Sequence, residues 1–522
     1  VQMLQSRKNR VVYAVIRLCQ CIHKPFPCTL ACSDNRKDLK FSPACRLRQL
    51  RGRCLKKDAP MTSKNLTAIM AESRALLTLA WPMVIAQLAQ IGTGVVDTLM
   101  AGHYSSTDLA AIAIGYNIWL PLYLFFIGVS LGASYIIAQH VGAGRVNEVR
   151  RLLPQTLWLA LAMGLVAGPL CYNAGPLLDL LELDAATHAR SMAYLQAVAF
   201  GLPAAAVFEA LRCHNQGVGV MRPFAIASVT AFLANIPLNY ALMYGRWGAP
   251  ELGAAGCGWA TVMSMWLGAL VLAFYMSRTQ RLRPYLPRLR LVAPHLPDIA
   301  AIVRLGLPIG FTLFLEVAFF SVIALFIATL GDVAIAAHQV AFNMWDVVYM
   351  PLVSFGSAMA VRVGHAIGAG DRPGVRLSIG CGISITILVG LVGMALLLSS
   401  PATLVSLYTS DPEITAVAII LVRIAGIFIA IDSAQVAASF CLRAFKDTRF
   451  AFFALCLAYW LITLPLGYWQ GIVVADNALD GTVAFWKSLI AGITVSSVLV
   501  IARLYMTLRK PLPQAEAVSA SA

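Results

Sequence analysis

Long apolar runs separated by short polar segments occupy most of the chain between residues 74 and 506. Each run is long enough to cross a hydrocarbon core about 30 Å thick at 1.5 Å of rise per residue. The pattern predicts twelve spanning helices, over 74–100, 108–140, 153–173, 189–211, 223–245, 255–276, 299–330, 335–366, 376–399, 414–441, 450–474 and 482–506. The expected fold class is therefore an all-α polytopic membrane protein.

Composition supports this fold class. The chain has 522 residues, of which 59% are hydrophobic and 12% charged, whereas soluble domains carry roughly 25% charged residues. This deficit excludes an ordinary cytoplasmic enzyme, a disordered chain and a compact nucleic-acid binder. The net charge of +16 is uneven, because residues 1–60 hold 14 Lys or Arg and 3 Asp.

The basic arm 1–60 also contains half of the cysteines: Cys19, Cys21, Cys28, Cys32, Cys45 and Cys54. A zinc site is one interpretation, but the C-x-C and C-x3-C spacings fit no usual tetrahedral set. A targeting segment is another, but the arm lacks a continuous apolar core and a cleavage site. We expect instead a disordered tail or sequence upstream of a start at Met61, because its composition supports no packed core.

Charges in the loops predict the orientation of the helices. Basic residues concentrate in alternate loops and at the carboxyl end: Arg145, Arg150, Arg151; Arg212, Arg222; Arg278, Arg281, Arg283, Arg288, Arg290; Arg372, Arg376; Arg443, Lys446, Arg449; Arg503, Arg509, Lys510. The other loops carry mainly acidic residues: Asp179, Glu182, Asp184, Glu251, Asp332, Asp411, Glu413, Asp476 and Asp480. The positive-inside rule places the basic loops and both termini in the cytoplasm. The expected location is a bacterial inner membrane.

The sequence repeats internally at a shift of 226 positions. Pro82 then aligns with Pro308, and the Gly-Ala-Gly turn at 142–144 aligns with the turn at 368–370. With a small insertion, Arg212 aligns with Arg443. The repeat predicts an N-lobe at 61–276, a basic linker at 277–298, a C-lobe at 299–510 and a tail at 511–522. Because six spans is an even number, the lobes are parallel repeats related by an axis along the membrane normal.

Acidic side chains inside spans are candidate functional residues, because each costs roughly 2.5–3.5 kcal/mol on insertion scales. Asp97 shares one polar helix stripe with Gln87 and Gln90. Glu316 and Asp432 lie deep in spans of the second half. Carboxylates of this kind offer hard oxygen ligands to Na⁺, and two neighbouring ones can share a proton. The alternative for Glu316 and Asp432 is simple pairing with an arginine or with backbone groups.

Other intramembrane polar residues carry weaker predictions. Asp346 either lines the cavity or bonds between helices, and Asn235 and Asn239 share one face and offer amide oxygens. Asp108 is predicted to be a helix N-cap. Glu209 lies near a cytoplasmic helix end, where snorkelling explains it.

No catalytic constellation is found in the sequence. Histidines are scattered, the Gly-Ala-Gly turns lack the lysine of a phosphate loop, and no ATPase motif is present. We therefore expect no enzyme activity and no cofactor, and transport that draws on a Na⁺ or H⁺ gradient.

Several motifs together resemble the multidrug and toxic compound extrusion (MATE) family, most closely its NorM-like bacterial branch. They are Trp81-Pro-Met, the segment 96–102 (Val-Asp-Thr-Leu-Met-Ala-Gly), the two Gly-Ala-Gly turns and the segment 443–448 (Arg-Ala-Phe-Lys-Asp-Thr). The resemblance covers about 65–510. It implies two six-helix lobes around a central cleft and exchange of Na⁺ or H⁺ for lipophilic organic cations.

The resemblance also implies roles for single residues. The cation-site acids of the family correspond to Glu316 and Asp432, and the first-helix acid to Asp97. Phe428 stands where the branch often has tyrosine, one turn before Asp432, and offers only a ring face to a cation. Asn235 and Asn239 replace a carboxylate found in a relative, which favours a sodium site at Glu316 and Asp432.

The expected function is an antiporter that works by alternating access, with small lipophilic cationic drugs and membrane lipid as partners, no nucleic acid, and a monomeric state. A lipid-linked oligosaccharide flippase of related two-lobe plan is the alternative, although its cleft should hold arginines for a pyrophosphate. A passive channel should show a filter or a charge ring, and an intramembrane enzyme should show a nucleophile with its base. The sequence shows neither.

Overall fold

The computed structural model describes residues 63–181, 183–287 and 292–512, and across these it contains helices and turns without a strand. The Cys-rich basic arm and the carboxyl end of the tail lie outside the described residues. The chain divides into one unit up to Ala75 and a second from Leu76 onward. The first residues of α3 (Ser63–Tyr104) belong to the first unit. All the other helices belong to the second unit.

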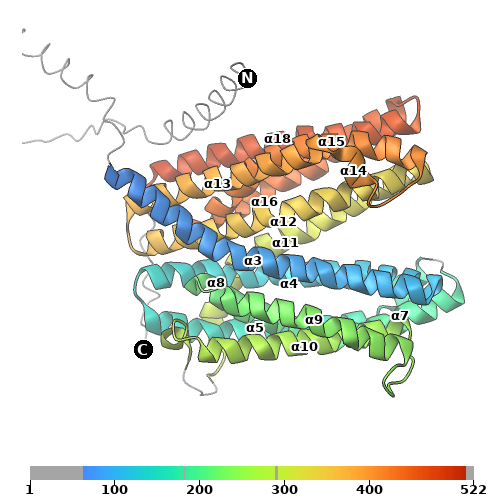
Figure 1. Ribbon diagram of the computed structural model, residues 1–522. Helices are drawn as coiled ribbons and strands as arrows, with labels where there is room; N and C mark the ends of the chain where they lie inside the picture. The colour runs from blue at the N-terminus through green and yellow to red at the C-terminus, as the bar shows by residue number, and fades with distance from the viewer. Residues whose placement is uncertain (1–62, 182, 288–291, 513–522) are drawn as a thin grey trace, which may run out of the picture. The chain divides into compact units, whose positions relative to one another are not determined.

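The helices of the first repeat, coloured from blue to green in Figure 1, follow the predicted order. They are α3 (Ser63–Tyr104), α4 (Ser106–Gly142), α5 (Val146–Tyr172), the short α6 (Gly175–Asp179), α7 (Ala185–Ala199), α8 (Leu202–Val218), α9 (Arg222–Tyr244) and α10 (Ala254–Arg278). The predicted span 189–211 is a broken one, since α7 and α8 meet at a bend of 45°. Gly201 and Pro203 lie at the bend, where a missing side chain and a missing backbone N–H both favour a break.

The second repeat, coloured from yellow to red, has the same sequence of spans (Figure 1). It contains α11 (Leu296–Ala328), α12 (Asp332–Gly368), α13 (Arg372–Ser399), the short α14 (Pro401–Val405), α15 (Pro412–Ala444) and α18 (Ala478–Arg509). Its fifth span is composite, with α16 (Thr448–Cys456), the π-helix η2 (Leu457–Thr463), α17 (Leu464–Tyr468) and the π-helix η3 (Trp469–Val474). Across the described residues, eleven long apolar helices and the bent pair give the twelve predicted spans.

The π-helix η2 has a local cause in the sequence. Pro465 lies two residues after its end, lacks a backbone N–H, and its ring crowds the carbonyl four residues earlier, which is inside η2. Widening the preceding turn relieves this clash and leaves the helix continuous. Residues Thr448–Val474 therefore remain one continuous candidate span.

Glycines hold the two repeats together along α4. Gly128 and Gly132 of α4 face Gly310 and Gly306 of α11, and a Cβ at any of the four would meet the partner's backbone or side chains. Two small-x-x-x-small stripes therefore pack backbone against backbone. This is how the first helix of the second repeat comes to pack on the first repeat.

A second crossing joins α4 to α12 and obeys the pseudo-two-fold symmetry. A Cβ on Gly142 would meet the carbonyl of His365, and a Cβ on Gly368 would meet the carbonyl of Gln139. The two contacts are repeat mates, since both pairs are related by the shift of 226 positions. They lie where α4 and α12 end at the two Gly-Ala-Gly turns, so the repeats are closely packed at this end of the helices.

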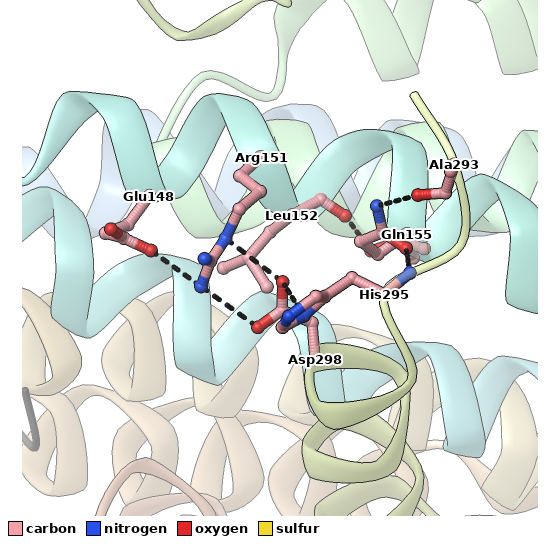
Figure 2. A network of polar contacts seen from close by, with 8 residues as sticks. Glu148, Arg151, Leu152, Gln155, Ala293, His295 and Asp298 are labelled. Atoms are coloured by element: carbon pink, nitrogen blue, oxygen red, sulfur yellow. Dashed lines mark hydrogen bonds and ion pairs between the residues drawn. The ribbon is translucent and has the colours of Figure 1, made fainter. Parts of the chain in front are cut away.

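The end of the interlobe linker is bound to α5 of the first repeat (Figure 2). Arg151 contacts Asp298 through two N···O distances of 3.1 Å and Glu148 at 2.9 Å. Gln155 donates to the carbonyl of Ala293 at 3.1 Å and accepts from the backbone N–H of His295 at 2.6 Å. The last residues of the linker are therefore a fixed element, and α11 starts from a defined position.

Candidate ion and substrate sites

In the first repeat, Asp97 on α3 lies in a closed polar cluster. Its carboxylate accepts a hydrogen bond from Asn239 Nδ2 at 2.5 Å and another from Thr261 at 3.4 Å. Asn239 also donates to Asn235 Oδ1 at 3.0 Å. All four side chains are buried, so the structure brings together Asp97, Asn235 and Asn239 as one site.

Two amide atoms of this cluster, Asn235 Nδ2 and Asn239 Oδ1, are buried without a hydrogen-bond partner. Buried unpaired polar atoms are costly, and a bound group that supplied the missing partners would relieve that cost. The carboxylate of Asp97 itself accepts hydrogen bonds from its protein neighbours. The unsatisfied atoms of this site are neutral amides.

In the second repeat, Glu316 on α11 lines a small cavity. The rest of the lining is mixed, with the apolar Val436, Ala451 and Leu455 beside polar and aromatic side chains: Thr312, Tyr349, Gln435, Ser439, Phe440, Arg443 and Tyr459. The space open to the centre of a water molecule is about 20 Å³, and a water needs roughly 10–15 Å³. The cavity can therefore hold a water or a desolvated small cation, but no organic molecule.

Aromatic stacking fixes the walls of this cavity. Tyr459, presented by η2, stacks on Phe319 at 4.4 Å between ring centroids, and Tyr349 stacks on Trp345 at 4.7 Å. Ring stacking restricts both tyrosines, so their hydroxyl groups occupy defined positions. Two of the side chains that line the cavity with Glu316 are thus held in place by stacking.

Asp432 on α15 is buried close enough to Glu316 for the two charges to act on each other. Its Oδ2 atom has no hydrogen-bond partner. Asp346 on α12 is half-buried, and its charge also acts on Glu316. The structure therefore gathers the three acids of the second repeat into one electrostatic group, two of which the sequence had paired.

The remaining predicted residues lie outside these two clusters. Gln87 is half-buried and donates weakly to the sulfur of Met350 on α12, at 3.5 Å. Gln90 is half-buried on the same helix. Phe428 is buried with its ring 5.7 Å from that of Trp345, so it packs in the core beside the cavity wall.

Two predictions are wrong. Ser105, rather than Asp108, is the N-cap of α4; Asp108 is buried, pairs with Arg190 and accepts from the backbone N–H of Ala254 at 2.8 Å. Glu209 does not snorkel either, because it is buried and paired with Arg212 on the same helix. In both cases an arginine neutralises the buried acid: Arg190 is distant from Asp108 in sequence, whereas Arg212 lies three residues after Glu209.

The sequence interpretation missed Arg443, Tyr349 and Tyr459 as cavity residues. Arg443 had been assigned only to a loop, because it lies near a predicted helix end. The internal repeat contained a usable signal. Gln90 is the repeat mate of Glu316, and Phe440 is the mate of Glu209. The aligned arginines Arg212 and Arg443 are therefore accompanied by an acid at a different position in each repeat.

Groups of three or more His, Cys, Asp or Glu side chains able to hold a metal ion are not found among the described residues. The six cysteines of the helical part are free thiols, all but Cys456 fully buried. What the second repeat offers is a small set of carboxylate, hydroxyl and amide oxygens. Such oxygens suit a monovalent cation or a proton.

Two parallel membrane repeats with buried acids on their helices define a secondary transporter, whose sites lie within the bundle. The family profile described as MatE matches this chain twice, over residues 82–241 and 308–469. The chain belongs to the MatE family. Members of this family are transporters driven by ion gradients rather than enzymes.

Curated relatives agree over most of the chain. The multidrug resistance protein PmpM of Pseudomonas aeruginosa is 38% identical over 449 residues, which cover 86% of this chain and 94% of that protein. The multidrug resistance protein MdtK of Photorhabdus laumondii is 35% identical, covering 85% of this chain and 97% of that protein.

Solved structures confirm the two-lobe helical fold. The eukaryotic MATE transporter AtDTX14 matches with a TM-score of 0.76 at 18% identity, covering 86% of this chain and all of that one. An outward-facing multidrug resistance MATE transporter of the MOP superfamily matches with a TM-score of 0.75 at 17% identity, covering 84% and 96%. Both predictions, of family and of fold class, are confirmed.

Proposed function

We propose that this protein exports lipophilic organic cations across a bacterial inner membrane in exchange for Na⁺, with H⁺ as the alternative coupling ion. Glu316 and Asp432 bind the coupling ion, and Asp97 attracts the cationic substrate. Both termini are cytoplasmic and the working unit is a monomer. The single observation that carries the proposal is the cation-sized cavity at Glu316, whose lining residue Gln435 lies one turn after Asp432 and its unpartnered carboxylate oxygen on α15.

The energetics favour a cation at this place. A buried carboxylate oxygen without a partner costs free energy that a bound cation or proton removes. The cavity adds the Glu316 carboxylate, the Thr312 hydroxyl and the Gln435 amide oxygen as hard ligands. In the absence of an ion, the cluster of Glu316, Asp432 and Asp346 repels itself.

The substrate side follows from charge and geometry. The cavity at Glu316 is too small for an organic cation, so drug and ion do not share it in this state. Asp97 provides a negative charge in the first repeat, and a flat cation gains attraction from that charge and from aromatic faces. Coupling then requires the drug and the ion to prefer different conformations of the two repeats.

The close glycine packing of α4 on α11 and α12 gives this scheme a structural basis. These glycine contacts form a seam between the repeats, which closes the side that the loop charges place in the cytoplasm. In this state a coupling ion reaches the bundle from the outer side. Separation of the seam would expose the sites to the cytoplasm, as alternating access requires.

The test is export of a fluorescent lipophilic cation, ethidium, from proteoliposomes that contain the full chain. Na⁺ and pH gradients are imposed separately on the wild type and on Glu316→Gln, Asp432→Asn and Asp97→Asn. We expect an inward Na⁺ gradient alone to drive export. Either C-lobe variant should lower the ion-driven rate at least about a hundredfold, because both remove charge from the ion site.

Asp97→Asn is the contrasting variant. It should raise the half-saturating ethidium concentration about tenfold, a loss of about 1.4 kcal/mol, and leave the ion dependence unchanged. Export driven only by a proton gradient would replace Na⁺ by H⁺ in the proposal. Undiminished ion-driven export in both C-lobe variants would overturn the assignment of the site.

The flippase alternative is not supported. The relatives that cover most of this chain are named multidrug resistance proteins. Within the described spans, the charges gathered at the two sites are mainly carboxylates, with Arg443 at the edge of one cavity. A pyrophosphate headgroup would meet repulsion there.

A further inference from the structure

Each repeat places an arginine and a tyrosine at equivalent positions, but the acid that accompanies them differs. Arg212 and Tyr123 in the first repeat are the mates of Arg443 and Tyr349 in the second. In the first repeat the acid is Glu209, one turn before the arginine on the same helix. In the second repeat that position is Phe440, and the acid is Glu316 on another helix.

In the first repeat the arginine is held locally. Arg212 Nε lies 2.5 Å from Glu209 Oε2, and Arg212 also donates to Gln216 Oε1 at 3.1 Å. Tyr123 donates to the other oxygen of Glu209 at 3.2 Å. Glu209 and Arg212 therefore neutralise each other within their own helix.

In the second repeat the arginine has no such partner on its own helix. Arg443 lies over the ring of Phe440, with its Cζ atom 4.5 Å from the ring centroid. Asp447, one turn further along the chain, is engaged by Arg503 at 2.7 Å. Asp447 is the N-cap of α16, and as the next acid along the chain it is therefore already paired.

What Arg443 does face is the cavity of Glu316. Both residues line it, and the positive charge of Arg443 acts on the Glu316 carboxylate. Among the ion pairs of the described residues, none joins Arg443 to Glu316, so the two charges are not in direct contact. Both border the same cavity, which has room for a small cation.

We propose that Arg443 is a tethered counter-cation, which partly neutralises Glu316 when no ion is bound and competes with the coupling ion for that carboxylate. This inference rests on the proposed function, because it assumes an ion site at Glu316. It assigns Arg443 the role of a positioning residue that sets ion affinity without ligating the ion. The aromatic platform of Phe440 keeps the guanidinium at the cavity edge without neutralising it.

The arrangement has a consequence for turnover. A carboxylate cluster with no internal cation would bind an ion tightly and release it slowly, whereas transport needs binding weak enough for the ion to leave. A fixed positive charge at the cavity edge lowers the occupancy of the ion and restores partial neutrality once it has left. Arg212, with its own glutamate, cannot act in this way.

The test measures the ion concentration that half-saturates ethidium export in proteoliposomes of the full chain. Arg443→Gln should lower that concentration about tenfold, equivalent to about 1.4 kcal/mol, and should slow the maximal rate as ion release becomes limiting. Arg443→Lys keeps a tethered charge and should stay close to the wild type. Arg212→Lys is the matched control in the first repeat and should leave the ion dependence unchanged.

A second variant keeps Arg443 but gives it a local partner. Phe440→Glu copies the Glu209–Arg212 pair into the second repeat and should lower the half-saturating ion concentration in the same direction as Arg443→Gln. Phe440→Gln is the uncharged comparison: it removes the aromatic platform without adding a counter-charge, so the half-saturating ion concentration should fall less than in Phe440→Glu. Unfolding temperatures measured in detergent identify any variant that fails to fold, in which case the other charged variant carries the test.

The outcomes separate the two proposals. A wild type with no ion-driven export overturns the proposed function. Ion-driven export in the wild type, together with an unchanged or higher half-saturating concentration in folded Arg443→Gln or Phe440→Glu, overturns the counter-cation role alone. A similar shift in Arg212→Lys would also overturn it, because the effect would then not be specific to the cavity.

Discussion

The two repeats treat their buried acids in opposite ways. In the first, Asp97 is bonded to Asn239 and Thr261, and Glu209 is paired with Arg212. In the second, Asp432 has an oxygen without a partner and Glu316 borders an open cavity. Satisfied acids stabilise the bundle, whereas unsatisfied acids carry a cost that binding removes. Two similar series of helices therefore contain a paired acid in one repeat and the proposed ion site in the other.

The largest effect that sharpens this comparison concerns the pair in the first repeat. Glu209→Gln should lower the free energy of unfolding by roughly 3–5 kcal/mol, because it leaves the buried Arg212 without a counter-charge. The measurement is unfolding by SDS titration in mixed micelles. Glu251→Gln is a control at the exposed Tyr104 contact, and should change stability by less than about 1 kcal/mol.

Equal stability losses in Glu209→Gln and Glu251→Gln would contradict the structural role of the Glu209–Arg212 pair. Arg443→Gln should cost less than Glu209→Gln in the same assay. A larger loss for Arg443→Gln would mean that the second repeat also depends on its arginine for folding, and the contrast between the repeats would fail.

A second contrast lies in how the repeats pack on each other. Gly306 on α11 faces the backbone of α4, whereas its repeat mate is Ala80. Gly306→Val should cost about 1–3 kcal/mol, because the added carbons force α4 and α11 apart. SDS titration of the purified variant gives the value.

The control for Gly306→Val is Gly380→Ala on α13, where an added Cβ would meet nothing within 4 Å. It should be neutral or stabilising by up to about 1 kcal/mol, through helix propensity. Full stability and transport in Gly306→Val would show that α4 and α11 do not need this close approach.

The smallest effect concerns the linker. The repeat mate of Arg151 is Leu377, so the first repeat alone has an arginine that holds the start of α11 through Asp298. Asp298→Asn should lower the free energy of unfolding by about 1 kcal/mol, since one partner is buried and the other partly exposed. Proteolysis within the linker at a fixed protease concentration should also become faster.

Glu148→Gln is the matched control for Asp298→Asn, because it removes the exposed partner of the same arginine. It should change stability by only a few tenths of a kcal/mol. Unchanged linker proteolysis in Asp298→Asn would show that the linker is held by its backbone contacts to Gln155 and not by the ion pair.

Much of the architecture follows from the sequence alone. Hydrophobic runs long enough to cross a membrane leave the backbone one choice, the helix, because lipid offers no partner for peptide groups. The spans, the repeat and the intramembrane acids Asp97, Glu316 and Asp432 could therefore be read directly. The cost of placing a carboxylate in lipid singles such residues out whatever their neighbours are.

Only the tertiary structure decided how those acids are used. Whether a buried carboxylate is neutralised depends on side chains that are distant in sequence, such as Asn239 for Asp97 and Arg190 for Asp108. The sequence assigned Glu209 and Arg443 to helix ends, because periodicity carries no information about which helices pack together. Hydrophobicity is local and fixes the spans, whereas the compensation of Asp97 and Asp108 is a contact between helices and exists only once they are assembled.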